Sequence, residues 1–457
     1  MHRKSKFNTK MSKNNFIVLI LAALFAFCLD VDAQQQIQTV HKVKKRETIY
    51  GIARDYNITI EELIGANPEM LQPGYALKKG STINIPFPQQ QQQQPAETTP
   101  VVTVKHSLDI GVMLPLHNVD GDGRRMIEYY RGLLMAIEKL KADGISINVR
   151  AWNVSQTDDI NSTLLQQGAE QSDIIFGPLY SKQVKALGDF CKKNKIRMVI
   201  PFSINGDEVN RNEFIYQVYQ PTETFNQKSI NSFIDRFSNC HPIIIDCNDS
   251  TSNKGTFTYA LRKKLEEKGI QYSITNLRSN LEMFEKAFST TKRNVVILNT
   301  GRSPELTQTM HKLDALLAHS PGYMISMFGY TEWQMYEKYN QNQTFFHKYD
   351  VYIPSSYFFN EQSGYIQSFQ RAYKTKFGVD MMNALPHFAL TGYDQGVFFI
   401  GGVYKFKGQF YGARNQIYNT SLQTPYHFSK TPNGGFRNEA YLLVHYQTNG
   451  GIETISY

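Results

Sequence analysis

The chain lacks the short motifs that mark the common enzyme classes. It contains no His-Glu-x-x-His, no Gly-x-Ser-x-Gly and no phosphate loop of the Gly-x4-Gly-Lys-Ser/Thr type. Its 11 histidines are scattered without the spacing of zinc ligands. Cys191 has no histidine close by in the sequence that would activate it as a nucleophile. We therefore expect a protein that is not an enzyme and that uses neither a cofactor nor a metal.

Cysteine is scarce, with 4 residues in 457. Three of them, Cys191, Cys240 and Cys247, follow the N-terminal region, and an odd number leaves at least one thiol free. Cys240 and Cys247 bracket an apolar run that is typical of a strand, which would separate their Cα atoms by about 23 Å. A disulfide needs a separation below about 7 Å. We expect these two thiols to remain unpaired and to pack as small apolar groups.

Basic clusters interleaved with aromatic residues are also missing. The net charge is +9, and the first 33 residues, with five basic and two acidic side chains, account for +3 of it. The remaining excess is spread among many acids, which excludes a nucleic-acid-binding surface of the usual kind.

The N-terminal 33 residues have the pattern of a secretory signal peptide. A basic stretch ends at Lys13, an apolar run covers 16–29, and small residues precede an expected cleavage near Ala33. Two alternatives stay open: an uncleaved anchor helix, and lipidation of Cys28, although Phe27 stands where a small residue is usual. No later apolar run is long enough to span a bilayer, so after cleavage we expect a periplasmic protein that does not cross the membrane.

A run of six glutamines flanked by prolines divides the rest of the chain. Such a segment cannot bury apolar surface, so it should act as a flexible tether. The domains expected from this division are the signal peptide (1–33), a small module (40–87), the linker (88–105) and a large domain (106–457).

The small module has the apolar spacing of a strand, two short helices and a closing strand. It resembles the LysM family over nearly its whole length. The residues that carry the resemblance are Val43, Glu47, Thr48, Ile49, Ile52, Ala53, Tyr56, Ile58, Thr59, Leu63, Asn67, Leu77, Lys78, Lys79, Gly80, Ile83, Ile85 and Pro86.

The LysM resemblance implies binding to N-acetylglucosamine polymers, above all peptidoglycan. Carried over by position, the groove would be formed by Glu47, Thr48, Ile49 and Tyr50, facing Asn67, Pro68, Met70 and Leu71. Two interpretations of Ile49 are open, as an apolar contact for the glycan or as part of the module's core. Arg46 is a departure, because the family usually has glycine there.

From Leu108 onward, strands alternate with helices in two successive runs. This alternation predicts an α/β fold with mainly parallel sheets covered by helices on both faces. Around Gly177–Ser181 and Pro201–Ser203 the chain resembles the type I periplasmic binding proteins, in particular the leucine-binding branch. The resemblance implies two lobes, the first from about 106–220 and 356–425, and the second from about 221–355 and 426–457.

Such proteins bind a small ligand between their lobes, at the carboxyl ends of the strands. In the first lobe we expect Leu116, Tyr180, Ser181 and Ser203 to line the cleft, with a ligand carboxylate held between the two serines. The alternative is that Ser181 caps its helix and Ser203 completes a turn.

In the second lobe the candidates are Asn248, Asn299, Thr300 and Tyr330, each near the end of a strand. The loop 246–252 lacks the Tyr-Gly pair that the leucine-binding branch would place there. These residues are therefore either ligand contacts or turn residues.

Three functions follow from these observations. The first is a peptidoglycan-associated binding protein for an amino-acid-like or wall-derived ligand, with a transporter as its protein partner. The second is a non-transporting regulator that contacts the proteins of cell-wall synthesis through its binding-protein-like domain. A wall hydrolase ranks last, because the catalytic motifs are missing.

Overall fold

The computed structural model describes residues 37–45, 47–56, 58, 60–72, 75, 77–86, 107–202, 205–339 and 342–457. The expected signal peptide, the glutamine linker, Arg46 and Ser203 lie outside this range, as do the side chains of Tyr50 and Leu71. The chain divides into two compact units between Val102 and Thr103. Among the described residues, no helix has both the length and the apolar character needed to cross a membrane.

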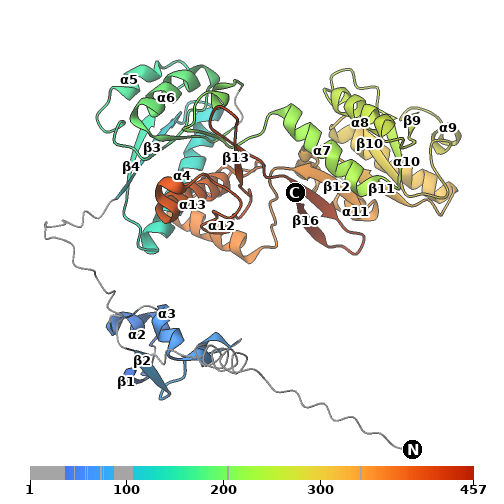
Figure 1. Ribbon diagram of the computed structural model, residues 1–457. Coiled ribbons are helices and arrows are strands. Elements are labelled where there is room, and N and C mark those ends of the chain that lie inside the picture. Colours follow the sequence, from blue (N-terminus) through green and yellow to red (C-terminus); the bar gives the residue numbers. More distant parts are fainter. Residues whose placement is uncertain are drawn as a thin grey trace, which may run out of the picture. The chain divides into compact units, whose positions relative to one another are not determined.

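The first unit is a small module with two antiparallel strands and short helices (Figure 1). Its apolar side chains form a separate core that includes Ile52, Leu63 and Ile85. The elements are β1 (Ile37–Lys42), α2 (Ile49–Asp55), α3 (Ile60–Gly65), a short 3₁₀ helix (Pro68–Leu71) and β2 (Thr82–Pro86).

The second unit contains two seven-stranded sheets in the described part of the chain. In the first sheet the strand order is β13-β14-β7-β6-β5-β3-β4, and every pair is parallel except β13 with β14. The strands are β3 (Leu108–Leu114), β4 (Ile147–Asn153), β5 (Ile174–Phe176), β6 (Arg197–Ile200), β7 (Ile215–Gln217), β13 (Phe428–Lys430) and β14 (Phe436–Asn438).

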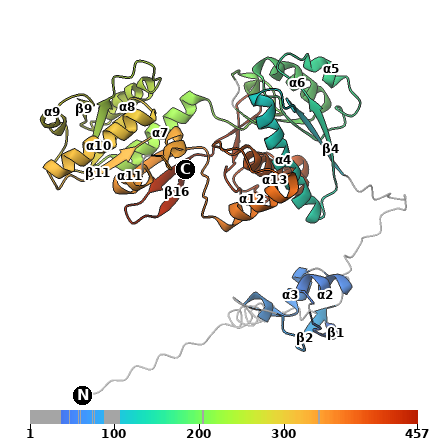
Figure 2. The ribbon, with the colours of Figure 1, turned by 180° about the vertical axis from the view of Figure 1, so that it is seen from behind.

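Alternation along the strands gives the first sheet two apolar faces. Ile174 and Phe176 of β5 belong to one core cluster, whereas Ile175 belongs to another on the opposite face. Helices therefore cover both sides of the sheet (Figures 1 and 2). They are α4 (Gly121–Ala142), α5 (Ile160–Leu164), α6 (Ser181–Asn194), α12 (Gly364–Phe377) and α13 (Phe388–Phe406), with 3₁₀ helices at Glu208–Asn210 and Lys407–Gln409.

Helices α4 and α13 lie side by side in both views (Figures 1 and 2). Their backbones approach closely at two glycines: a Cβ on Gly132 would lie 1.8 Å from the Ala389 oxygen, and one on Gly392 would lie 2.0 Å from the Tyr129 oxygen. No other residue fits this crossing without moving the helices apart.

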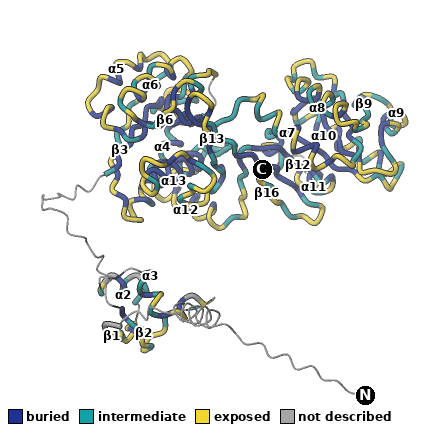
Figure 3. Tube along the Cα trace, in the orientation of Figure 1, coloured by how far each residue is buried: buried dark blue, intermediate teal, exposed yellow. Residues whose placement is uncertain are grey.

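The second sheet has the order β16-β15-β12-β11-β10-β8-β9, parallel from β12 to β9 and antiparallel at β15 and β16. Its central strands are fully buried (Figure 3). The strands are β8 (His241–Asp246), β9 (Ser273–Asn276), β10 (Asn294–Leu298), β11 (Ile325–Phe328), β12 (Val351–Ser355), β15 (Leu442–Tyr446) and β16 (Ile452–Ser456). The helices are α7 (Thr222–Phe237), α8 (Gly255–Glu267), α9 (Leu281–Glu285), α10 (Ser303–His319) and α11 (Asn342–Lys348), with a 3₁₀ helix at Thr331–Tyr336.

The chain passes between the two sheets after β7, after β12 and after β14. The last passage corrects the expected lobe boundary near residue 425. Both β13 and β14 belong to the first sheet, and Phe436 of β14 pairs with Tyr216 of β7. The chain therefore enters the second lobe between Asn438 and Leu442 rather than at residue 426.

Candidate binding sites

In the small module, Glu47 holds the first loop together. The Glu47 carboxylate lies 2.8 Å from His41 Nε2 and accepts the Lys44 backbone N–H at 2.6 Å. The other ring nitrogen of His41 lies 2.9 Å from the Tyr56 hydroxyl. The hydrogen bonds from His41 and Lys44 lower the pKa of Glu47 below its ordinary value. Glu47 therefore organises the loop that precedes α2.

Thr48 and Ile49 differ in exposure although they are neighbours. The Thr48 hydroxyl accepts the Gly51 backbone N–H at 3.0 Å, and Thr48 is exposed. Ile49 is half-buried and packs against the module's core. In each of these two residues, only the solvent-facing part of the side chain can contact a glycan.

On the opposite segment, Asn67 is buried and its side chain is fully used. It donates to the Leu63 and Asn84 carbonyls at 2.8 and 2.7 Å and accepts the Asn84 N–H at 2.7 Å. Met70 belongs to the core, whereas Pro68 is exposed. Of the expected groove residues on this segment, Pro68 alone among the described side chains faces solvent.

In the first lobe, Tyr180 and Ser181 lie at the carboxyl edge of the sheet, between β5 and the start of α6. Gly177, which precedes them, has a φ of +140°, and a Cβ there would lie 2.2 Å from the Met113 oxygen. The Tyr180 hydroxyl donates to Asp122 at 3.3 Å. Burial and then the Asp122 charge raise the pKa of Tyr180 to about 12.

The hydroxyl of Ser181 has a partner within the chain. Ser181 is the first residue of α6, and its hydroxyl oxygen accepts the Asn205 N–H at 3.2 Å. Leu116 follows β3, and its N–H donates to Asn153 at 2.7 Å. Leu116, Tyr180 and Ser181 thus lie just after neighbouring strands, β3 and β5, and these polar contacts are made to other residues of the first lobe.

In the second lobe, the loops after β8 and β10 are tied together. Asn299 accepts the Cys247 N–H and donates to Asp246, both at 2.9 Å. Thr300 donates to Asp249 at 2.8 Å. The hydroxyls of Thr251 and Thr300 lower the pKa of Asp249 to about 2.

Asn248 is bonded in the same way as its neighbours. Its side chain exchanges hydrogen bonds with Asn276 at the end of β9, at 2.9 and 3.1 Å. The residue has a φ of +55°, a conformation that asparagine tolerates better than most residues. Asn299 and Thr300 therefore bond to the loop that contains Asn248, whereas the Asn248 side chain bonds to the end of β9.

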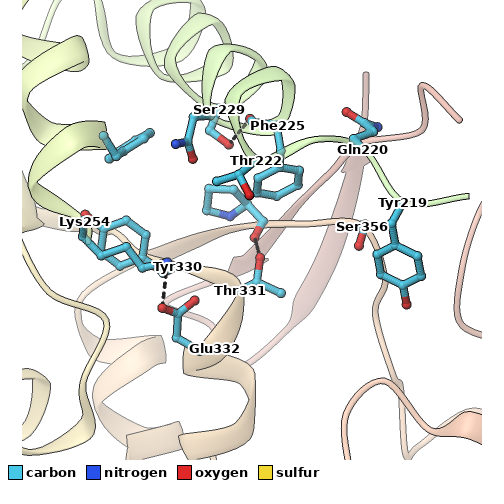
Figure 4. Close-up of a pocket in the computed structure, with 13 residues that line it drawn as sticks. Tyr219, Gln220, Thr222, Phe225, Ser229, Lys254, Tyr330, Thr331, Glu332 and Ser356 are labelled. Atoms are coloured by element: carbon cyan, nitrogen blue, oxygen red, sulfur yellow. Dashed lines mark hydrogen bonds and ion pairs between the residues drawn. The ribbon is translucent and has the colours of Figure 1, made fainter. Parts of the chain in front are cut away.

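A cavity of about 270 Å³ opens at the carboxyl edge of the second sheet (Figure 4). We call it the second-lobe pocket. It is lined by Tyr219, Gln220, Thr222, Phe225, Asn226, Ser229, Lys254, Phe257, Tyr330, Thr331, Glu332, Pro354 and Ser356. These residues come from the connections that follow β7 and β12, from the first half of α7, from β12 itself, from the residue before α8 and its first turn, and from the segment after β11. Tyr330 was expected at the ligand site, and the rest of the set was not.

Lys254 forms an ion pair with Glu332 and lies over the Tyr330 ring inside this pocket (Figure 4). Lys254 Nζ lies 2.8 Å from Glu332 Oε1 and 4.6 Å from the centre of the Tyr330 ring. Tyr330 is buried, its hydroxyl donates to the Leu298 carbonyl, and burial raises its pKa well above the ordinary value. One signal in the sequence could have located Glu332, namely its position just after a strand. No such signal marks Lys254, which follows a polar loop.

In the described part of the chain, no group of three or more His, Cys, Asp and Glu side chains is arranged so that it could hold a metal ion.

Comparison with known proteins separates the two units. Residues 41–86 match the family described as LysM domain. The larger unit has the fold of the type I periplasmic binding proteins. A protein described as a branched-chain amino acid ABC transporter from Rhodospirillum rubrum matches with a TM-score of 0.50 and 14% identity, over 77% of this chain and 100% of that one.

Two further solved structures give lower TM-scores. A branched-chain amino acid ABC transporter periplasmic ligand-binding protein from Burkholderia xenovorans gives a TM-score of 0.45 at 11% identity, over 76% of this chain and 94% of that one. An ABC transporter substrate-binding protein from Sphaerobacter thermophilus gives 0.44 at 13%, over 77% and 97%. The fold assignment rests on the first match. Comparison with curated proteins gives no match.

Proposed function

We propose that this protein is an exported, peptidoglycan-associated binding protein. The LysM domain at residues 41–86 would bind N-acetylglucosamine glycan, and the two-lobed domain would bind a small amino-acid-like or wall-derived ligand. The observation that carries the ligand half is the second-lobe pocket, which lies where open α/β sheets bind ligands. The periplasm is the compartment in which both partners meet.

Attachment to the wall would act through local concentration. A LysM domain joined to the larger unit by a glutamine-rich segment keeps the binding domain near the polymer without requiring high affinity from the domain itself. The exposed side chains of Thr48 and Pro68, together with the outward part of Ile49, would form the glycan contact. Glu47 and Asn67 would hold that surface in shape.

Calorimetric titration of residues 34–457, the chain expected after cleavage at Ala33 and called the mature chain below, tests the proposed binding of a small ligand. The panel contains soluble muropeptides and amino acids. We expect saturable binding to at least one compound, and weakened binding in Asn226→Ala, which alters the pocket wall. Asn231→Ala, on the same helix but outside the pocket, serves as the control. The absence of binding across the whole panel would contradict the proposal.

A second function is favoured by the internal hydrogen bonds of the expected cleft residues. Ser181, Asn299 and Thr300 already have partners within the chain. A domain whose cleft groups are satisfied in this way would suit a non-transporting regulator of wall synthesis that works through its surface. Capture of a peptidoglycan synthase by the mature chain, unchanged in Asn226→Ala, would favour this alternative.

A further inference from the structure

The second-lobe pocket contains a cation that belongs to the chain itself. Lys254 lies just before α8, and its ammonium rests against both the Tyr330 ring and the Glu332 carboxylate (Figure 4). The two charged side chains are about three-quarters buried, with 26% and 28% of their surfaces exposed. The pair is therefore part of the pocket wall rather than an exposed surface ion pair.

An aromatic face beside a carboxylate is a typical recognition site for an ammonium group. In this pocket, Lys254 already occupies that position. Glu332 is the one acidic residue among the described residues that line the pocket, and Lys254 is the one basic residue. A ligand ammonium would have to displace Lys254 and leave it without its partner, or it would have to lie beside a like charge. Both arrangements are unfavourable.

The backbone around Glu332 supports this arrangement. Gly301 lies against the Glu332 side chain, and a Cβ at that position would be 2.1 Å from Glu332 Oε1. The carboxylate is thus accommodated beside the loop that follows β10, on the side of the pocket where it meets Lys254. The packing holds the acid in the position that pairs with the lysine.

The other walls of the pocket are neutral. Four aromatic rings, from Tyr219, Phe225, Phe257 and Tyr330, are combined with amide and hydroxyl groups. The hydrogen-bonding groups come from Gln220, Thr222, Asn226, Ser229, Thr331 and Ser356. Amide and hydroxyl side chains can both donate to and accept from a ligand amide, and the rings can cover apolar groups.

We propose that the second-lobe pocket binds N-acylated amino acids and rejects free α-amino acids, with Lys254 as the specificity-determining residue. In such a ligand an amide replaces the ammonium, so nothing competes with Lys254 for Glu332. This inference rests on the proposed ligand-binding function and narrows its ligand class to compounds with a blocked amino group.

The test is titration of the mature chain with matched pairs of compounds. The probes are L-alanine, L-leucine and L-phenylalanine, each free and N-acetylated. We expect at least one N-acetyl compound to bind tenfold or more tightly than its free counterpart. Equal or tighter binding of the free amino acids would overturn the inference.

Variants of Lys254 make the test specific. Lys254→Met keeps the apolar stem but releases Glu332, so binding of the free amino acid should rise about tenfold or more. Lys254→Arg keeps the cation and should retain the preference for the N-acetyl compound. Lys264→Met is the matched control, because Lys264 lies on α8, the helix that Lys254 precedes, and pairs with Glu267 at 3.0 Å outside the pocket. An unchanged ratio of affinities in Lys254→Met would overturn the inference.

The outcomes separate this inference from the proposed function. If the wild-type chain bound free amino acids more tightly than N-acetylated ones, the proposed ligand-binding function would be supported and the proposed role of Lys254 would be contradicted. Free amino acids that bind only to Lys254→Met would support the role of Lys254 even if the wild-type chain bound none of the six probes. If neither the wild-type chain nor Lys254→Met bound any of these probes or any muropeptide, the inference and the proposed function would both be overturned.

Discussion

Asn67 and Asn84 exchange two hydrogen bonds in the LysM domain. The Asn67 amide donates to the Asn84 carbonyl, and the Asn84 N–H donates to Asn67 Oδ1, both at 2.7 Å. The same amide also donates to the Leu63 carbonyl at the end of α3. A side chain expected to contact the glycan thus joins α3 to β2 in the interior of the domain.

Asn67→Ala should therefore destabilise the LysM domain rather than merely weaken glycan binding. The substitution leaves buried backbone groups without partners, at about 1–3 kcal/mol for each unsatisfied group. We expect faster hydrogen exchange of the β2 amides in the mature chain, measured by mass spectrometry. Pro68→Ala, at the exposed residue next to Asn67, is the control and should leave the hydrogen exchange of the β2 amides unchanged. Equal exchange in Asn67→Ala and wild type would show that the side chain has no structural role.

Asn299→Ala should lower the stability of the second lobe. It removes the acceptor of the Cys247 N–H and the donor to Asp246, so a loss of about 1–3 kcal/mol is expected. Differential scanning calorimetry measures the change, with the exposed Asn231→Ala as the reference. Ligand affinity should change little, because Asn299 does not line the second-lobe pocket. An unchanged unfolding midpoint would contradict the structural role.

Asp394 should make stability depend on pH. Its carboxylate accepts the N–H groups of Leu422, Gln423 and Thr424, yet burial outweighs these bonds and raises its pKa to about 7. The unfolded value is about 3.9. The unfolded chain therefore releases this proton first, and the contribution of Asp394 to stability falls as the pH rises from about 4 through 7.

Asp394→Asn removes this titration. We expect the difference between the wild-type and variant melting temperatures to shift in favour of the variant between pH 5 and pH 8. Parallel pH profiles, or a shift in favour of the wild type, would contradict the raised pKa.

The three described cysteines should differ in reactivity. Burial raises the pKa of Cys247 to about 12 and also raises those of Cys191 and Cys240. Cys191 and Cys247 are buried, whereas Cys240 is partly exposed. In the folded chain at neutral pH we expect iodoacetamide to modify Cys240 first and Cys191 very slowly, and in urea all three should react. Peptide mass spectrometry measures the extent of modification at each cysteine, and faster modification of Cys191 than of Cys240 would contradict the prediction.

The sequence predicted the fold because its strongest signals are local. Alternating strands and helices indicated two parallel sheets, and the small module carried a dense family pattern. The boundary near residue 425 was wrong because β13 and β14 have three residues each, too few for alternation to be recognised. Their membership of the first sheet depends on pairing with β7, which lies more than 200 residues earlier.

The sequence indicated where along the sheets the candidate residues lie, but not what their side chains contact. Strand ends located Ser181, Asn299 and Tyr330 at the correct sheet edges. Whether a polar residue faces a ligand or a neighbouring loop depends on partners that are distant in sequence, as between Thr300 and Asp249. The pairing of Lys254 with Glu332 across 78 positions has the same origin and left no local pattern.

Attachment to the wall is the claim on which the proposed function depends most. The direct measurement is co-sedimentation of the mature chain with purified, insoluble peptidoglycan sacculi, beside the same chain without residues 41–86. We predict that the full chain pellets with the sacculi and that the shortened chain stays in the supernatant. Recovery of the full chain in the supernatant, or equal pelleting of both chains, would contradict the account.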